Sequence, residues 1–288
     1  MAEMRRASFL KGVFLSFLVL GGCALRVKNV KPAAPYDFAL LDQMAKYAQA
    51  AYADDAAIRA LCRPAYGDVY IQTISATDNK YFLATSTVTH THLIAIAGTA
   101  NLENALLDAD LTQESVPELK ISLHRGFARA ARLVFNDVKP RLVPGYRLQI
   151  TGHSLGGAEA VILAMMFQAM GTPAERVITF GQPKVSNQAG VDAFHNLPLT
   201  RVVNQNDMVP ELPLAPYSHI GPELVLFPGS TYSLVEARPL DPAVIAAAWQ
   251  ALQHHQAPAE LPEHYIANYL TNLDPKVSTS QDIPYPKT

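Results

Sequence analysis

The sequence has little cysteine and little charge. Two cysteines, Cys23 and Cys62, are too few to build a disulfide framework, so stability has to come from a hydrophobic core. Charged residues make up 17% of the chain, the formal net charge is −2 and no basic run occurs, which argues against a nucleic-acid partner. The 49% of hydrophobic residues are enough for one large α/β domain.

Sequence signatures of metal and cofactor binding are also missing. The nine histidines are scattered and lack carboxylate or cysteine partners at ligand spacing. His90 and His92 share one face of a predicted strand, but two ligands are insufficient for a metal site. No glycine-rich phosphate loop and no dinucleotide fingerprint occur. We therefore expect neither a metal nor a cofactor.

The N-terminal apolar run, residues 13–20, is too short for a transmembrane helix, which needs about 20 residues. Basic residues precede it, and Leu20-Gly21-Gly22-Cys23 follows it. This pattern resembles a bacterial lipoprotein signal. We expect residues 1–22 to be removed, Cys23 to be lipidated, and residues 23–35 to tether the mature chain to a membrane of the bacterial cell envelope. Secretion without a lipid is the alternative.

The most informative stretch is 150–157, Ile-Thr-Gly-His-Ser-Leu-Gly-Gly, in which a strand ends in Gly-x-Ser-x-Gly and a helix begins. This is the local pattern of a nucleophile elbow, with Ser154 as the nucleophile. The turn is so sharp that its flanking positions need small residues, here Gly152, Gly156 and Gly157. Ser154 would lie at the positive end of the following helix, where backbone N–H groups stabilise negative charge on a substrate oxygen.

A serine nucleophile needs a base and a carboxylate that orients the base. In this architecture the chain order is serine, acid, histidine. Asp207 is the best candidate acid because it follows a β-branched strand, and sites of open α/β sheets lie beyond strand ends. The alternative is that Asn206 and Asp207 only form a turn.

Chain order leaves four histidine positions after Ser154 as candidates for the base. His195 and the pair His254 and His255 fall in predicted helical stretches and are expected to be solvated. His219, before a predicted strand, and His264, at a predicted helix start, remain. The residues alone do not decide between these two.

Hydrophobic periodicity predicts alternating strands and helices, hence a mainly parallel sheet with helices on both faces. The expected helices are 38–52, 127–139, 158–170 and 243–255. The expected strands are 68–74, 81–86, 91–97, 146–151, 176–180, 199–204, 224–227 and 231–235.

Seven separated stretches resemble, in order, the motifs of the fungal-type (class 3) lipase family. They are AIAGTAN (95–101), LHRGFARA (123–130), ITGHSLGGAEA (150–160), ITFGQPKVSN (178–187), VVNQNDMVPELP (202–213), YSHIGPELVLF (217–227) and LPEHYIANYL (261–270). The resemblance implies an α/β-hydrolase fold over residues 36–274. It also implies that Asp207 is the acid, that His264 is the base and that His219 is structural. Independently of the resemblance, we expect residues 275–288 to form a loose C-terminal tail.

The same resemblance implies an oxyanion hole made by the backbone N–H groups of Thr99 and Leu155. It places residues 100–111 where the family has a lid helix. In this chain Ala105 stands at the position of a bulky tryptophan found in several family members. The resemblance therefore does not imply that a lipid surface activates the protein by opening this segment.

These expectations combine into one hypothesis of function. Ser154, His264 and Asp207 would hydrolyse lipid esters, triacylglycerol or phospholipid, through an acyl-enzyme. The partners would be the lipid substrate and, through Cys23, a membrane. The alternatives are an esterase for short soluble esters and a catalytically silent envelope lipoprotein that binds acyl chains.

Overall fold

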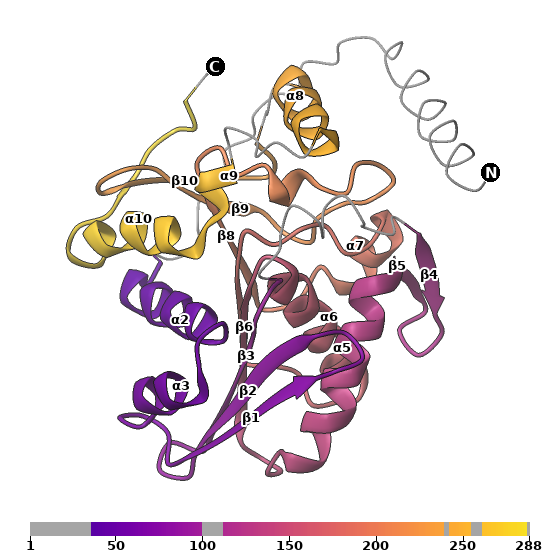
Figure 1. The fold of residues 1–288 in the computed structure, drawn as a ribbon, viewed down its shortest axis with the longest axis vertical. Coiled ribbons are helices and arrows are strands. Elements are labelled where there is room, and N and C mark those ends of the chain that lie inside the picture. Colours follow the sequence, from indigo (N-terminus) through magenta and orange to yellow (C-terminus); the bar gives the residue numbers. More distant parts are fainter. Residues whose placement is uncertain (1–35, 100–111, 239–241, 255–260, 287–288) are drawn as a thin grey trace.

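The computed structural model describes residues 36–99, 112–238, 242–254 and 261–286. Within these ranges helices cover both faces of a nine-stranded sheet (Figure 1). The expected signal with Cys23, the tether, the lid segment 100–111 and His255 lie outside the described residues.

The sheet has the strand order β1-β2-β3-β6-β7-β8-β9-β10-β11. Strands β3, β6, β7, β8 and β9 run parallel to one another. Strand β2 pairs antiparallel with β1 and with β3, β10 pairs antiparallel with β9, and β11 is parallel to β10. The mainly parallel sheet is thus confirmed. The bounds are β1 Asp68–Ile74, β2 Asn79–Ser86, β3 Thr91–Ile96, β6 Arg147–His153, β7 Arg176–Phe180, β8 Leu199–Asn204, β9 Glu223–Leu226, β10 Thr231–Val235 and β11 Gln281–Asp282.

Two groups of helices enclose this sheet (Figure 1). On one face lie α2 Phe38–Ala50, α3 Asp55–Cys62 and α10 Ile266–Ser278; on the other lie α5 Arg125–Val138, α6 Leu155–Ala169 and α7 Gln188–Phe194. The remaining elements are the hairpin β4 Gln113–Val116 and β5 Ile121–His124, the 3₁₀ turns η1 Lys139–Arg141 and η2 Val209–Glu211, and the helices α8 Pro242–Gln253 and α9 Leu261–His264. None of the described helices has the length and hydropathy needed to cross a membrane.

Strand β3 shows how the two cores are separated. All six of its residues are buried, and successive side chains point to opposite faces. Leu93 and Ala95 pack with the core under α2, whereas Ile94 and Ile96 pack with the core around α6. A strand buried on both faces is mostly apolar, and residues 93–96 of β3 show this pattern in the sequence.

The end of the chain differs from the expected loose tail. Helix α10 runs to Ser278, and β11 pairs with β10. Lys276 is 1% exposed, and its ammonium group donates to the carbonyl oxygens of Phe227, Gly229 and Asn272 at 2.6–2.7 Å. The expectation of a tail from residue 275 was wrong because this lysine is satisfied by three backbone acceptors that sequence patterns do not reveal.

Glu159 of α6 is a buried carboxyl group whose side chain accepts a hydrogen bond from Asn79 of β2. Burial raises the pKa of Glu159 from 4.5 to about 8, against the opposing effect of that hydrogen bond. The folded state therefore keeps a proton that the unfolded chain releases above about pH 4.5. Stability is lost as the pH rises from 4.5 towards 8 and then stays constant.

We expect Glu159→Gln to remove this loss, because glutamine stays neutral and still accepts from Asn79. In urea unfolding, the variant should exceed the wild type by roughly 2–4 kcal/mol at pH 9 and match it near pH 4. Glu175→Gln is the control and should instead lower the stability at pH 9. Burial would raise the pKa of Glu175, but contacts with Gln149, Arg176 and Arg147 outweigh it and lower that pKa. An equal gain at both pH values would contradict the assignment.

Candidate active site

Ser154 lies between β6 and α6 in a strained turn. Its backbone has φ 59° and ψ −130°, a region that non-glycine residues avoid. The turn is held because Ser154 N–H donates to Phe180 O at 2.9 Å, while Ser154 O accepts from the N–H groups of Gly157 and Ala158. The structure thus has the geometry of the nucleophile elbow predicted from Gly-x-Ser-x-Gly.

Two glycines of this motif are required because neighbouring backbone leaves no room for a side chain. A Cβ on Gly152 would overlap the carbonyl of Gly156, and a Cβ on Gly156 would overlap the carbonyl of Ile96 on β3. These are backbone atoms, so rotating a side chain cannot relieve either overlap. The close packing of α6 on β3 and β6 therefore depends on the glycine spacing.

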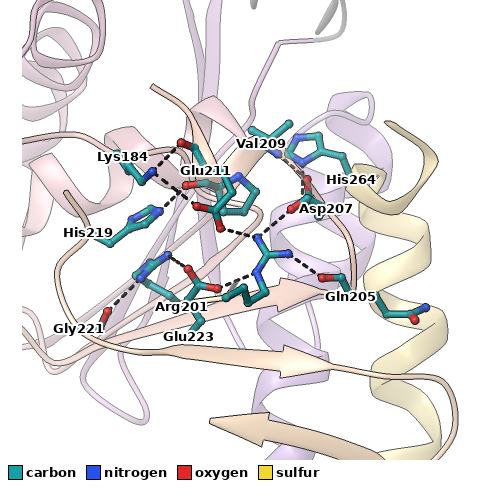
Figure 2. A network of polar contacts seen from close by, with 12 residues as sticks. Lys184, Arg201, Gln205, Asp207, Val209, Glu211, His219, Gly221, Glu223 and His264 are labelled. Atoms are coloured by element: carbon teal, nitrogen blue, oxygen red, sulfur yellow. Dashed lines mark hydrogen bonds and ion pairs between the residues drawn. The ribbon is translucent and has the colours of Figure 1, made fainter. Parts of the chain in front are cut away.

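Asp207 and His264 lie next to each other and form a buried pair (Figure 2). His264 Nδ1 lies 2.8 Å from Asp207 Oδ2. Because a carboxylate only accepts, Nδ1 carries the proton and His264 Nε2 is left as the basic nitrogen. Both His264 Nε2 and Ser154 Oγ are buried and have no hydrogen-bond partner among the described residues. The two atoms that proton transfer would use are thus unoccupied by other contacts.

The carboxylate of Asp207 is held in its ionised form. It accepts from Tyr269 Oη at 2.5 Å and from the Val209 N–H at 2.9 Å in addition to His264. Burial alone would raise the pKa of Asp207, but the charge of His264 and these hydrogen bonds outweigh it and lower the pKa. An ionised, fully buried acid is what is needed to orient an imidazole and to stabilise its protonated form.

His153, the residue before the serine, supports His264 from the side. Its Nε2 lies 2.7 Å from His264 O and therefore donates, so its Nδ1 accepts from Tyr52 Oη at 2.9 Å. Burial, reinforced by the nearby His264, lowers the pKa of His153 to about 3. His153 is therefore a neutral spacer of fixed tautomer between the serine turn and the base.

The structure distinguishes His219 from His264, the two histidines between which the local sequence did not decide. His219 Nε2 donates to Pro210 O at 2.5 Å, and its Nδ1 has no partner in the described part of the chain. Burial and the neighbouring cations Arg201 and Lys184 lower the pKa of His219 well below its usual value. His264, not His219, is the histidine brought to Asp207. His195 and His254 are exposed, as expected.

Of the expected oxyanion donors, Leu155 follows Ser154 directly in the chain, and Thr99 follows Gly98, which lies beside Ser154. Leu155 is the first residue of α6, where backbone N–H groups have no acceptor within the helix. Gly98, which precedes Thr99, lies so close that a Cβ there would come within 3.0 Å of Ser154 Cβ. Both residues are half-buried. In the described ranges, no group of three or more histidine, cysteine or acidic side chains could hold a metal ion.

A buried ionic network contacts the backbone of the loop that carries Asp207 (Figure 2). Arg238 donates to Gln205 O at 2.6 Å and to Asp207 O at 2.8 Å, and it forms ion pairs with Glu223 and Glu211. Arg201 pairs with the other oxygen of Glu223 at 3.0 Å. Burial would raise the pKa of Glu223, but Arg238 and Arg201 hold it below its usual value.

Sequence reasoning missed Arg238, Tyr269 and Tyr52. Arg238 lies 31 positions after Asp207 and Tyr269 lies 62 after it, and no local pattern marks either residue. The available signal was indirect: an arginine or a tyrosine has to find polar partners if it is buried.

Part of the chain is similar in sequence to known lipases. Residues 93–217 match the family model described as Lipase (class 3). A lipase of Rhizomucor miehei is 29% identical over 161 residues, which cover 51% of this chain and 44% of the relative. The secreted mono- and diacylglycerol lipase A of Penicillium cyclopium is 29% identical over 159 residues, covering 51% and 52%. The chain spans about half the length of the curated relatives it matches.

Solved structures extend the likeness to most of the fold. The crystal structure of a lipase from Rhizopus microsporus var. chinensis has a TM-score of 0.62 at 20% identity and covers 84% of this chain and 96% of that one. Lip2 lipase from Yarrowia lipolytica has a TM-score of 0.59 at 19% identity, with coverage of 74% and 88%. The chain therefore has the α/β-hydrolase fold that the motifs implied.

We expect Arg238→Met to destabilise the protein by about 3–5 kcal/mol, because Glu223 loses one ion pair and two buried carbonyl groups lose their donor. Arg132→Met is the matched control. Its guanidinium group pairs with Glu118 at the surface, so its loss should cost at most about 1 kcal/mol. Urea unfolding of both variants measures the difference, and equal losses would contradict the importance of the network.

Proposed function

We propose that this chain hydrolyses carboxylic esters of lipids through an acyl-enzyme on Ser154. The observation that carries the proposal is the serine elbow next to a buried Asp207–His264 pair whose basic nitrogen is left without a partner. The match to the class 3 lipase model, which includes Ser154 and Asp207, supports the same reaction. Its fold is that of known lipases.

The first half of the reaction forms the acyl-enzyme. Ser154 Oγ attacks the ester carbonyl carbon while its proton passes to His264 Nε2. The negative charge that develops on the carbonyl oxygen is stabilised by the N–H groups of Thr99 and Leu155 and by the positive end of α6. Asp207 stabilises the protonated imidazole. His264 then gives its proton to the leaving alkoxide as the carbon–oxygen bond breaks.

The second half releases the acid by the same route. Water gives a proton to His264 Nε2 and attacks the acyl carbon, and the oxyanion is stabilised again by the two N–H groups. Collapse returns the proton to Ser154 Oγ and frees the carboxylic acid. No metal or cofactor is needed for any of these steps.

Lipid esters are the substrate class favoured by the comparisons. The relatives are named as lipases or as mono- and diacylglycerol lipases, which supports glycerolipid esters for this chain. Short soluble esters use the same chemistry and are the alternative within this mechanism. A silent protein that binds acyl chains is the alternative outside it. A strained serine near a histidine that is held by an ionised, buried aspartate is typical of catalytic sites, which is why we favour catalysis over acyl binding.

Ser154→Ala and His264→Ala should each lower kcat for ester hydrolysis by at least about 10³-fold, because they remove the nucleophile and the base. The control is His219→Gln, which keeps a donor for Pro210 O and should retain activity within about threefold. Initial rates on triolein emulsions and on p-nitrophenyl acetate separate lipid from short-ester preference. Circular dichroism checks the fold.

A fluorophosphonate probe gives an independent reading. In the wild type it should label Ser154, located by mass spectrometry, and labelling should be absent from Ser154→Ala and slow in His264→Ala. A folded wild-type protein with neither hydrolysis nor labelling would favour the silent binding protein and overturn the proposal.

We further propose that the mature chain is anchored to a membrane of the bacterial cell envelope by a lipid on Cys23. The support is the sequence alone: basic residues, the apolar run 13–20 and small residues before the cysteine. The relatives that are named as secreted lipases favour export and support the alternative, secretion without a lipid.

Expressed with its own N-terminus in a bacterium, the protein should lose residues 1–22, gain the mass of a diacylglyceryl group on Cys23 and enter the membrane fraction. Cys23→Ser should abolish the added mass and leave the protein either in the soluble fraction or with residues 1–22 still attached. A wild-type N-terminus at Cys23 without added mass would support plain secretion and contradict the anchor.

A further inference from the structure

Asn204 is the last residue of β8 and is fully buried. Its side-chain amide group donates to Glu263 O at 3.0 Å and to Glu263 Oε2 at 2.8 Å, and its side-chain oxygen accepts from Asn272 Nδ2 at 2.6 Å. Both of its N–H bonds and its oxygen are therefore used. Glu263 directly precedes His264, so this one side chain ties the end of β8 to the turn that carries the candidate base.

The backbone of Asn204 holds the other member of the pair. Its carbonyl oxygen accepts from the Asp207 N–H at 2.8 Å, which closes the turn at the end of β8. The same residue thus fixes the start of the Asp207 loop by its main chain and the residue before His264 by its side chain. The distance between acid and base depends on both attachments.

The two carbonyl groups that flank the His264 peptide unit are bound by different strands. Glu263 O accepts from Asn204 on β8, and His264 O accepts from His153 Nε2 on β6. His264 itself lies at the junction of α9 and α10, where no helical ladder fixes both of these groups. Two side chains, from the parallel strands β6 and β8 on either side of β7, therefore fix the backbone of the candidate base relative to the acid and the serine.

We propose that Asn204 is a positioning residue for His264, acting through Glu263, in the reaction proposed above. It does not touch the reacting atoms. Losing its donors would free Glu263 and let the imidazole move relative to Asp207 and Ser154. Because a misplacement of about 1 Å lowers turnover by about 10²-fold, the effect should fall on kcat rather than on substrate binding.

Asn204→Asp is the sharpest test, because it keeps the shape but replaces the NH₂ group and its two N–H donors by one oxygen atom that faces the Glu263 carboxylate and carbonyl. We expect kcat for a soluble ester to fall about 30- to 100-fold while KM stays within about threefold. Glu263→Gln keeps an acceptor for Asn204 and should be near wild type. In Asn204→Asp/Glu263→Gln the side-chain bond is restored with reversed polarity, and at least about tenfold of the loss should be recovered.

Ser233→Ala is the control for lost stability alone. Ser233 is fully buried on β10 and donates to Ile283 O at 2.5 Å, so its loss should lower the urea midpoint and leave kcat unchanged. If Asn204→Asp does not fold, Glu263→Ala removes only the carboxylate acceptor and should lower kcat by about three- to tenfold.

Proton NMR supplies a readout that does not need turnover. The Nδ1–H of His264, hydrogen-bonded to a carboxylate, should give a signal downfield of the amide region that is absent from His264→Ala and is shifted or lost in Asn204→Asp. A hydrolytically active wild type with Asn204→Asp kcat within threefold and the signal unchanged would overturn the inference. A wild type without hydrolysis would instead contradict the proposed function, and the NMR signal would still test the positioning role.

Discussion

The hydrogen bond between His264 Nδ1 and Asp207 Oδ2 is the contact on which the candidate site depends. It joins residues 57 positions apart and is fully buried. Burying an ionised acid is costly unless its oxygen atoms are satisfied, and Tyr269 and the Val209 N–H supply that compensation. The loop around Asp207 is in turn fixed by Arg238, so the acid cannot turn away from the base.

Two other histidines near the candidate site are poorly suited to take up a proton. His153 and His219 are both buried and kept neutral, the first beside His264 and the second among cations. Their protons have fixed acceptors, His264 O and Pro210 O. In the proposed reaction a proton taken from Ser154 would therefore pass to His264 Nε2 rather than to His153 or His219.

The sequence predicted local features of the site and missed those made by tertiary contact. The elbow was predictable because strand, turn and helix are contiguous, and Ser154 has the strained φ that the pattern requires. His264 could be separated from His219 only by family resemblance, since the choice depends on which loop folds back to Asp207. The roles of Arg238 and Asn204 could not be predicted because their partners are distant in sequence. Lys276 was misplaced for the same reason: it was expected in a loose tail, but it is buried.

The position of Lys276 explains how a base near the end of the chain is held firmly. Its ammonium group joins the last turns of α10 to the β9–β10 turn, and β11 then adds a strand to the sheet edge. Helix α10 also carries Tyr269, which donates to Asp207, and Asn272, which donates to Asn204. The attachments of α10 at its C-terminal end thus keep two of its side chains in contact with the residues that set the acid and the base. In this fold helix α10 is therefore part of the support of the candidate site.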